Sequence, residues 1–175
     1  LAYSEKQTAD YTATLTGASD RQGRTYLLNA WRTRVQEQED RGEDDEIGLG
    51  ATLARHIERL SPRPTLIGIW SGAFQKRLAT QDLCVRVMRL LRVKGINVRV
   101  VSVPETTDKV FRAQLPAGRA EIGDVYADRD APWWGPFIAE LLAFPKGAHD
   151  DWVDTLSGLL ELQIMAAKVE QEEAP

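Results

Sequence analysis

The sequence has few of the side chains on which many catalytic and structural sites depend. Its 175 residues include one cysteine, Cys84, and two histidines, His56 and His149. A single cysteine excludes an internal disulfide and fits a reducing compartment. Because Leu83 and Val85 flank this thiol, we expect a buried cysteine rather than a nucleophile. The sequence therefore suggests no Ser–His or Cys–His catalytic arrangement.

Long apolar segments and an excess of positive charge are also missing. No apolar run approaches the roughly 20 residues of a membrane span, and no signal peptide is recognisable, so we expect no membrane association. The formal net charge is −4, so any contact with nucleic acid must come from a local basic patch. No Gly-rich loop ends in Lys-Ser or Lys-Thr, which excludes a phosphate-binding P-loop within these residues.

The composition is otherwise that of an ordinary globular protein. Hydrophobic residues make up 43% of the chain and charged residues 27%, and this length can bury a full core. We predict one domain over residues 1–169 and an acidic, disordered tail over residues 170–175. Because the sequence enters at Leu1 within an apolar stretch, we expect it to be a fragment of a longer protein.

Turn residues and hydrophobic periodicity predict the elements of the first half. Alternation predicts strands over 11–16 and 24–34, which form a hairpin around the turn at 17–23. The charged run 36–46 is typical of a solvated linker or a frayed helix start. Apolar residues at helical spacing predict a helix over 47–60, which the Pro-rich segment after it ends.

The second half predicts an α/β fold. Strands are expected over 65–70 and 96–103 around a long helix at 73–93, which is the rhythm of a parallel βαβ unit with a right-handed crossover. Further elements follow: a helix over 106–113, a break at 115–118, a strand or hairpin arm over 121–127, and helices over 131–144 and 149–169. A hairpin followed by βαβ and helices predicts a central mixed sheet with helices on both faces.

The start of the last predicted helix carries more acid than a helix cap requires. Asp150 and Asp151 are adjacent there, and Asp154 follows one turn on. One Asp is enough to accept hydrogen bonds from the unpaired N–H groups of a helix start. Asp150 and Asp154 share a face at i, i+4, and clustered carboxylates are the ligands that Mg²⁺ or Mn²⁺ prefers. The alternative is a helix cap with a solvated neighbour.

This stretch also carries a family resemblance. Residues 144–157 read FPKGAHDDWVDTLS and resemble the last motif in the nuclease domain of tailed-phage terminase large subunits, the motors that package viral DNA. Three more blocks resemble the family in the same order: Ala2-Tyr3-Ser4 with Thr8-Ala9-Asp10-Tyr11-Thr12-Ala13; Thr107-Asp108-Lys109 with Arg112-Ala113; and Ala131-Pro132-Trp133, Phe137, Glu140-Leu141 and Phe144-Pro145. Their order is more specific than any single block. The resemblance implies a ribonuclease H-like fold.

The resemblance implies a metal-dependent endonuclease that cleaves concatemeric double-stranded DNA. In such enzymes two ions activate water and stabilise the leaving oxygen of the phosphodiester. It assigns Asp150 and Asp151 as the catalytic metal ligands, with Mg²⁺ or Mn²⁺ as the cofactor. His149 and Asp154 are expected to support these ligands, although a histidine at a helix start is as well explained as a cap residue.

The sequence departs from the family pattern at the other acidic positions. The first acid of the family is expected just before Leu1. The second is expected on the strand over 65–70, where Trp70 stands in place of the usual Glu or Asp. Since Trp does not ligate a metal, the register assigned to this strand is wrong, another acid compensates, or this copy of the site is altered.

Two basic features are candidates for contacts with DNA. Lys109 and Arg112 lie at i, i+3 on one predicted helix face, where they can grip a phosphate, or they form a solvated surface pair. The helix over 73–93 carries a basic stripe, with Asp82 as its only acid. The stripe either faces DNA or is the solvent-exposed side of the helix. The stripe consists of Lys76, Arg77, Arg86, Arg89 and Arg92, with Lys94 just beyond.

The implied partners are double-stranded DNA, the portal protein, the small terminase subunit and an ATPase domain upstream in the same chain. The implied location is the cytoplasm of the bacterial host during virion assembly. One alternative is a DNA- or portal-docking module of the same fold whose metal site is impaired. Another is a ribonuclease H-like nuclease of the resolvase or transposase type, which an upstream sequence without a P-loop ATPase would favour.

Overall fold

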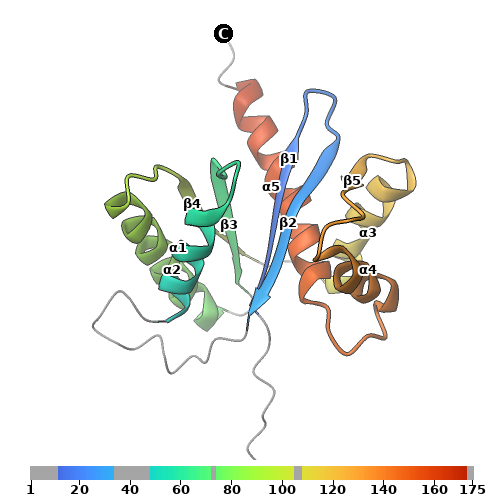
Figure 1. The fold of residues 1–175 in the computed structure, drawn as a ribbon, viewed down its shortest axis with the longest axis horizontal. Coiled ribbons are helices and arrows are strands. Elements are labelled where there is room, and N and C mark those ends of the chain that lie inside the picture. Colours follow the sequence, from blue (N-terminus) through green and yellow to red (C-terminus); the bar gives the residue numbers. More distant parts are fainter. Residues whose placement is uncertain (1–11, 34–47, 72–73, 105–107, 173–175) are drawn as a thin grey trace, which may run out of the picture. The chain divides into compact units, whose positions relative to one another are not determined.

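A computed structural model describes residues 12–33, 48–71, 74–104 and 108–172 (Figure 1). The predictions for residues 1–10 and for the charged run 36–46 lie outside these ranges. The chain divides into two compact units, and each is described by itself. One unit comprises Leu1–Thr12 and Thr33–Glu105, and the other comprises Ala13–Arg32 and Thr106–Pro175. No helix within the described ranges is long and apolar enough to cross a membrane.

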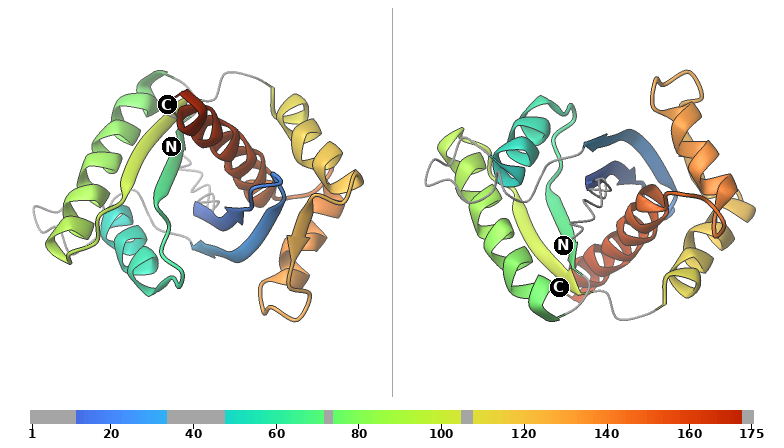
Figure 2. Two further views of the ribbon diagram at one scale, coloured as in Figure 1. Left: turned by 90° about the horizontal axis from the view of Figure 1, so that it is seen from above. Right: turned by 90° about the horizontal axis from the view of Figure 1, so that it is seen from below.

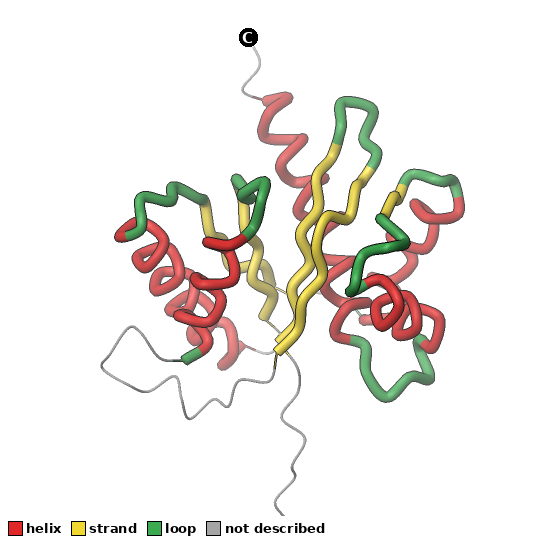
Figure 3. The backbone as a smooth tube through the Cα atoms, in the orientation of Figure 1, coloured by secondary structure: helices red, strands yellow, loops and turns green. Residues whose placement is uncertain are grey.

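The first unit contains the predicted βαβ arrangement. Its elements are α1 (Leu49–Arg59), β3 (Leu66–Ser71), α2 (Phe74–Val93) and β4 (Arg99–Pro104). The two strands pair in parallel, with Ile67 opposite Val100, and α1 and α2 appear as neighbouring helices in Figures 1 and 3. The parallel pairing predicted from the strand–helix–strand rhythm is therefore confirmed.

Apolar faces at helical spacing hold this unit together. Val87 and Leu91 of α2 are completely buried, and Ala54 and Ile57 of α1 are almost completely buried. Cys84 is buried as expected, and burial raises the pKa of its thiol above the ordinary value. A raised pKa keeps the thiol protonated and therefore a poor nucleophile.

The second unit is built on a three-stranded sheet with the order β1–β2–β5. β1 and β2 form the predicted hairpin, and β2 pairs with β5 in parallel, with Thr25 opposite Val125, so the sheet is mixed. Figures 1 and 2 show α5 running along this hairpin. The elements are β1 (Thr12–Ser19), β2 (Thr25–Thr33), α3 (Lys109–Glu121), β5 (Val125–Ala127), α4 (Trp134–Ala143) and α5 (Asp151–Glu172).

The hairpin turn is fixed by one aspartate. The Oδ1 atom of Asp20 accepts hydrogen bonds from the backbone N–H groups of Gln22 at 2.9 Å and Arg24 at 3.0 Å. Gly23 has φ 81°, a backbone conformation that glycine adopts at little cost. Turn chemistry at these positions therefore sets the register of the two strands.

An aromatic core fills the second unit. Phe137 of α4 is 1% exposed, and its ring centroid lies 5.8 Å from that of Trp152 in α5. Leu27 and Ala30 of β2 and Leu156 of α5 complete the buried cluster. Trp133 and Trp134 pack against this cluster.

Three predictions of detail differ from the structure. α3 continues through the expected break at 115–118, because Pro116 is buried within the helix and its packing offsets the hydrogen bond that proline cannot donate. The segment around Val125 is not a hairpin arm, since β5 pairs in parallel with β2. α5 extends to Glu172, three residues beyond the predicted end.

The α/β class is confirmed, but the described strands form two separate sheets rather than one central sheet.

Truncating the central aromatic ring tests the importance of this core. Phe137→Ala is expected to lower the free energy of unfolding by about 3–5 kcal/mol, because it removes a fully buried ring and leaves a cavity. Urea denaturation followed by circular dichroism measures the change. Leu142→Ala on the same helix is the control, since Leu142 is 79% exposed and its loss should change stability by at most about 0.5 kcal/mol. Equal losses for both variants would contradict the assignment of the core.

Candidate functional site

The candidate site lies where the start of α3 meets the start of α5, within the second unit. α3 begins at Lys109 because Asp108 caps it. Asp108 Oδ1 accepts hydrogen bonds from the N–H groups of Val110 at 2.9 Å and Phe111 at 3.3 Å. This N-cap places Lys109 and Arg112 in the first turn of the helix.

Three ion pairs join these two cations to the acids of the last motif. Lys109 Nζ lies 2.8 Å from Asp150 Oδ2 and 2.8 Å from Asp154 Oδ2. Arg112 Nη2 lies 2.7 Å from Asp154 Oδ1. Asp154 therefore binds one cation with each of its carboxylate oxygens, and Lys109 bridges the two carboxylates. The predicted i, i+4 proximity of Asp150 and Asp154 is realised through this bridge.

The four side chains differ in their access to solvent. The side chain of Arg112 is 7% exposed, whereas those of Lys109, Asp154 and Asp150 are 36%, 27% and 43% exposed. The alternative of a solvated surface pair is therefore wrong for Arg112. Arg112 holds Asp154 at the buried end of the cluster. Lys109 and Asp150 form its solvent-exposed end.

The electrostatics of Lys109 follow from this arrangement. Partial burial acts to lower the pKa of its ammonium, but the hydrogen bonds to Asp150 and Asp154 outweigh burial and hold the pKa above its ordinary value. Lys109 is thus a permanent cation at neutral pH, positioned between two carboxylates.

The start of α5 is held by a carboxylate from α4. Glu140 Oε1 accepts a hydrogen bond from the backbone N–H of Trp152 at 2.6 Å. Its Oε2 accepts one from Arg32 Nη1 at 3.0 Å, and the Glu140 side chain is only 5% exposed. The Arg32 guanidinium also lies 4.4 Å above the ring of Trp152. Glu140 therefore satisfies a helix-start N–H group that Asp150 or Asp151 was expected to bind under the cap interpretation.

Glu140 was not predicted from the sequence as a residue of the candidate site. It appeared there only as part of the block that precedes the last motif. The available signal was composition, because Glu140 is the one charged residue in the otherwise apolar helix α4. A lone acid on a helix of this kind is buried only when it is paired or hydrogen-bonded.

The other predicted ligands lie beside this cluster. Asp151 is the first residue of α5 and is half-buried, and His149 precedes the helix and is exposed. The carboxylates of Asp150 and Asp154 are brought together by Lys109. The assignment of Asp151 as a metal ligand and of His149 as a supporting residue stays a prediction.

The carboxylates of Asp150 and Asp154 would supply part of the ligand set of a divalent cation. Two carboxylate oxygens already share one cation, the Lys109 ammonium, and hard oxygens are the donors that Mg²⁺ prefers. Within the described ranges, no group of three or more His, Cys, Asp or Glu residues is arranged to hold a metal ion. Mg²⁺ is commonly held by one or two carboxylates together with water and substrate phosphates, which matches a site of this composition.

The strand expected to supply a second acid supplies none. β3 has the sequence LIGIWS, so shifting the register along this strand does not bring in an Asp or Glu. Trp70 is half-buried and pairs with Val103 of β4. Its indole N–H has no hydrogen-bond partner among the described residues. Compensation by another acid and an altered copy of the site remain as explanations.

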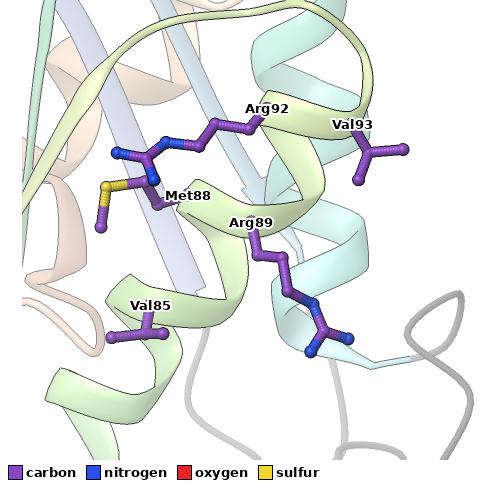
Figure 4. A pocket seen from close by; sticks show the side chains of 5 residues that line it. All are labelled: Val85, Met88, Arg89, Arg92 and Val93. Carbon is purple, nitrogen blue, oxygen red and sulfur yellow. The ribbon is translucent and has the colours of Figure 1, made fainter.

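The basic stripe on α2 is partly neutralised by neighbouring acids. Arg86 pairs with Asp82 at 3.1 Å, and Lys94 pairs with Glu58 at 2.7 Å. The side chains of the two stripe residues at positions 76 and 77 lie outside the described part of the chain. Figure 4 shows the remaining arginines beside exposed apolar side chains around a shallow hollow, lined by Val85, Met88, Arg89, Arg92 and Val93. The stripe is therefore a mixed basic and apolar surface.

Removing the buried cap tests how the start of α5 is held. Glu140→Ala is expected to lower the free energy of unfolding by about 2–4 kcal/mol, because it leaves Arg32 and the Trp152 N–H without their partner. Glu140→Gln should cost less, since an amide oxygen still accepts from Trp152. Urea denaturation measures both. Glu121→Ala, at an exposed position, is the control, and a loss no larger than that of the control would refute the cap.

Comparison with known proteins adds no identification to this geometry. No family model, curated protein or solved structure matches the chain. The candidate site therefore rests on the contacts among Lys109, Arg112, Glu140 and the acids at the start of α5.

Proposed function

We propose that this chain is the metal-dependent endonuclease domain of a viral DNA-packaging terminase large subunit, with a ribonuclease H-like fold. One observation carries the proposal. The block that contains Lys109 and Arg112 and the motif that contains Asp150 and Asp154 are joined by three ion pairs, although the hydrogen-bonded pair Arg112 and Asp154 is 42 residues apart in the sequence.

A second contact supports the same proposal. Glu140 belongs to the block that precedes the last motif, and it binds the N–H of Trp152 within that motif. Three blocks that were recognised separately by resemblance thus converge on one helix start.

Each residue has a role in the proposed reaction. Bound Mg²⁺ or Mn²⁺ would activate water and stabilise the leaving oxygen of the phosphodiester. Asp150 and Asp151 hold the ion, and Arg112 fixes Asp154 beside them. Lys109 is the cation nearest the solvent-facing end of the cluster and is the group best placed to contact a DNA phosphate. His149 immediately precedes α5 and is exposed.

The proposed partners follow from the family rather than from any surface of the chain. They are double-stranded DNA, the portal, the small terminase subunit and an upstream ATPase domain, with assembly in the host cytoplasm. Contacts with phosphates imply low sequence preference, since phosphates carry no sequence information.

A second candidate function is a docking module of the same fold that does not cleave DNA. The observation that favours it is the absence of any acid in β3, where Trp70 occupies the expected position. A DNA-docking module would bind DNA as the nuclease does, a portal-docking module need not, and neither would cleave it, so cleavage distinguishes the two candidates. A resolvase- or transposase-type nuclease shares the chemistry and differs in its upstream sequence.

Cleavage of supercoiled plasmid with Mn²⁺ or Mg²⁺ tests the proposal. The chain is expected to nick or degrade plasmid in either metal and to lose this activity when EDTA removes the metal. The double variant Asp150→Ala, Asp151→Ala should lose cleavage by at least about 100-fold, because both proposed ligands are gone. Agarose gels quantify the rate.

The matched control is Glu121→Ala, Asp130→Ala, which removes the same charge at exposed positions and should cleave like the parent chain. Cleavage that survives in the Asp150, Asp151 variant would point to a contaminating nuclease and overturn the assignment. No cleavage by a folded parent chain that still shifts DNA on a gel would favour the docking module instead.

A further inference from the structure

Lys109 occupies the place of a cation at the proposed metal site. Its Nζ lies 2.8 Å from Asp150 Oδ2 and 2.8 Å from Asp154 Oδ2. These are the distances of charge-assisted hydrogen bonds, so each carboxylate already has a close positive partner. Arg112 holds the other oxygen of Asp154 at 2.7 Å, which keeps that acid in place for the bridge.

A divalent ion and the Lys109 ammonium repel each other when both bind Asp150. A Mg²⁺ ion lies about 2.1 Å from a carboxylate oxygen that binds it. An ion on Asp150 Oδ2 would therefore lie within about 5 Å of Lys109 Nζ, a separation at which like charges near a protein surface repel strongly. Either the ammonium withdraws or the ion binds weakly.

The Lys109 side chain has room to withdraw. It is 36% exposed, and Asp150 is 43% exposed, so the ammonium can move into water on its flexible stem. Arg112 has no such freedom, because its side chain is 7% exposed. The two cations are therefore not equivalent, and the exchangeable one is Lys109.

We propose that Lys109 is a built-in competitor of the metal, a counter-ion that neutralises Asp150 and Asp154 until a divalent cation displaces it. This inference rests on the proposed function, since it concerns the regulation of the same metal site. With Lys109 in place the acids do not repel one another and the helix start is stable without metal. Metal binding is weakened by the free energy needed to break two ion pairs.

Isothermal titration calorimetry of the full 175-residue chain with Mn²⁺ tests the inference without relying on activity. Lys109→Gln is expected to bind Mn²⁺ roughly tenfold more tightly than the parent chain, because the competing charge is gone. Lys109→Arg keeps the charge and should bind like the parent. Lys146→Gln removes the same charge at an exposed position between α4 and α5 and should change affinity by less than about twofold.

The outcomes separate this inference from the proposed function. Binding of Mn²⁺ by the parent chain that Asp150→Asn weakens, with no tightening in Lys109→Gln, would overturn the competitor role and leave the metal site standing. No binding by any folded variant, Lys109→Gln included, would overturn both. Circular dichroism confirms folding, and Lys109→Met is a second charge-removing variant that carries the same test if Lys109→Gln unfolds. Tightening in Lys109→Gln alone supports the inference.

Discussion

The hydrogen bond from the Trp152 N–H to Glu140 ties the start of α5, which carries the acids of the candidate site, to α4. A carboxylate with 5% exposure is stable only when its oxygens have partners. Glu140 has two, one from the backbone of α5 and one from Arg32 in β2. Because Arg32 also covers the ring of Trp152, the sheet, α4 and α5 are tied at one point. The contacts of Glu140 therefore help to position the acids that precede and follow Trp152.

The charges around that point are nearly balanced within the described residues. Asp150 and Asp154 face Lys109 and Arg112, two acids against two cations. A cluster balanced in this way needs no metal to be stable, in contrast to sites whose acids repel one another in the empty state. Asp151 adds a further negative charge at the same helix start.

Sequence patterns predicted helices and strands well where neighbouring residues determine the structure. The hairpin follows from alternation and from the turn at Asp20, and the parallel pairing of β3 and β4 follows from a strand–helix–strand rhythm. α3 was predicted too short because the burial of Pro116 is a tertiary effect. Periodicity favours a helix, but only packing decides whether a proline interrupts it.

The site shows the same division between local and long-range causes. The acids at Asp150, Asp151 and Asp154 stand out in the sequence because three carboxylates in five residues exceed a cap. The pairing of Asp154 with Arg112 does not, because the contact spans 42 residues. The role of Glu140 was hidden for the same reason, since a cap supplied by another helix leaves no mark next to the helix that it caps. Spacing predicts which residues share a face, and the fold decides which faces meet.

On the proposed function, the acids at the start of α5 would be the protein ligands of the metal. Water or a phosphate of the DNA would then supply the rest of the octahedral shell that Mg²⁺ prefers. DNA would then contribute ligands as well as being the substrate, so metal and DNA would raise each other's affinity by the same factor. If Lys109 competes with the metal as proposed, a phosphate would offer the released ammonium a new partner. DNA would then favour binding of the ion through both its own ligands and its contact with Lys109.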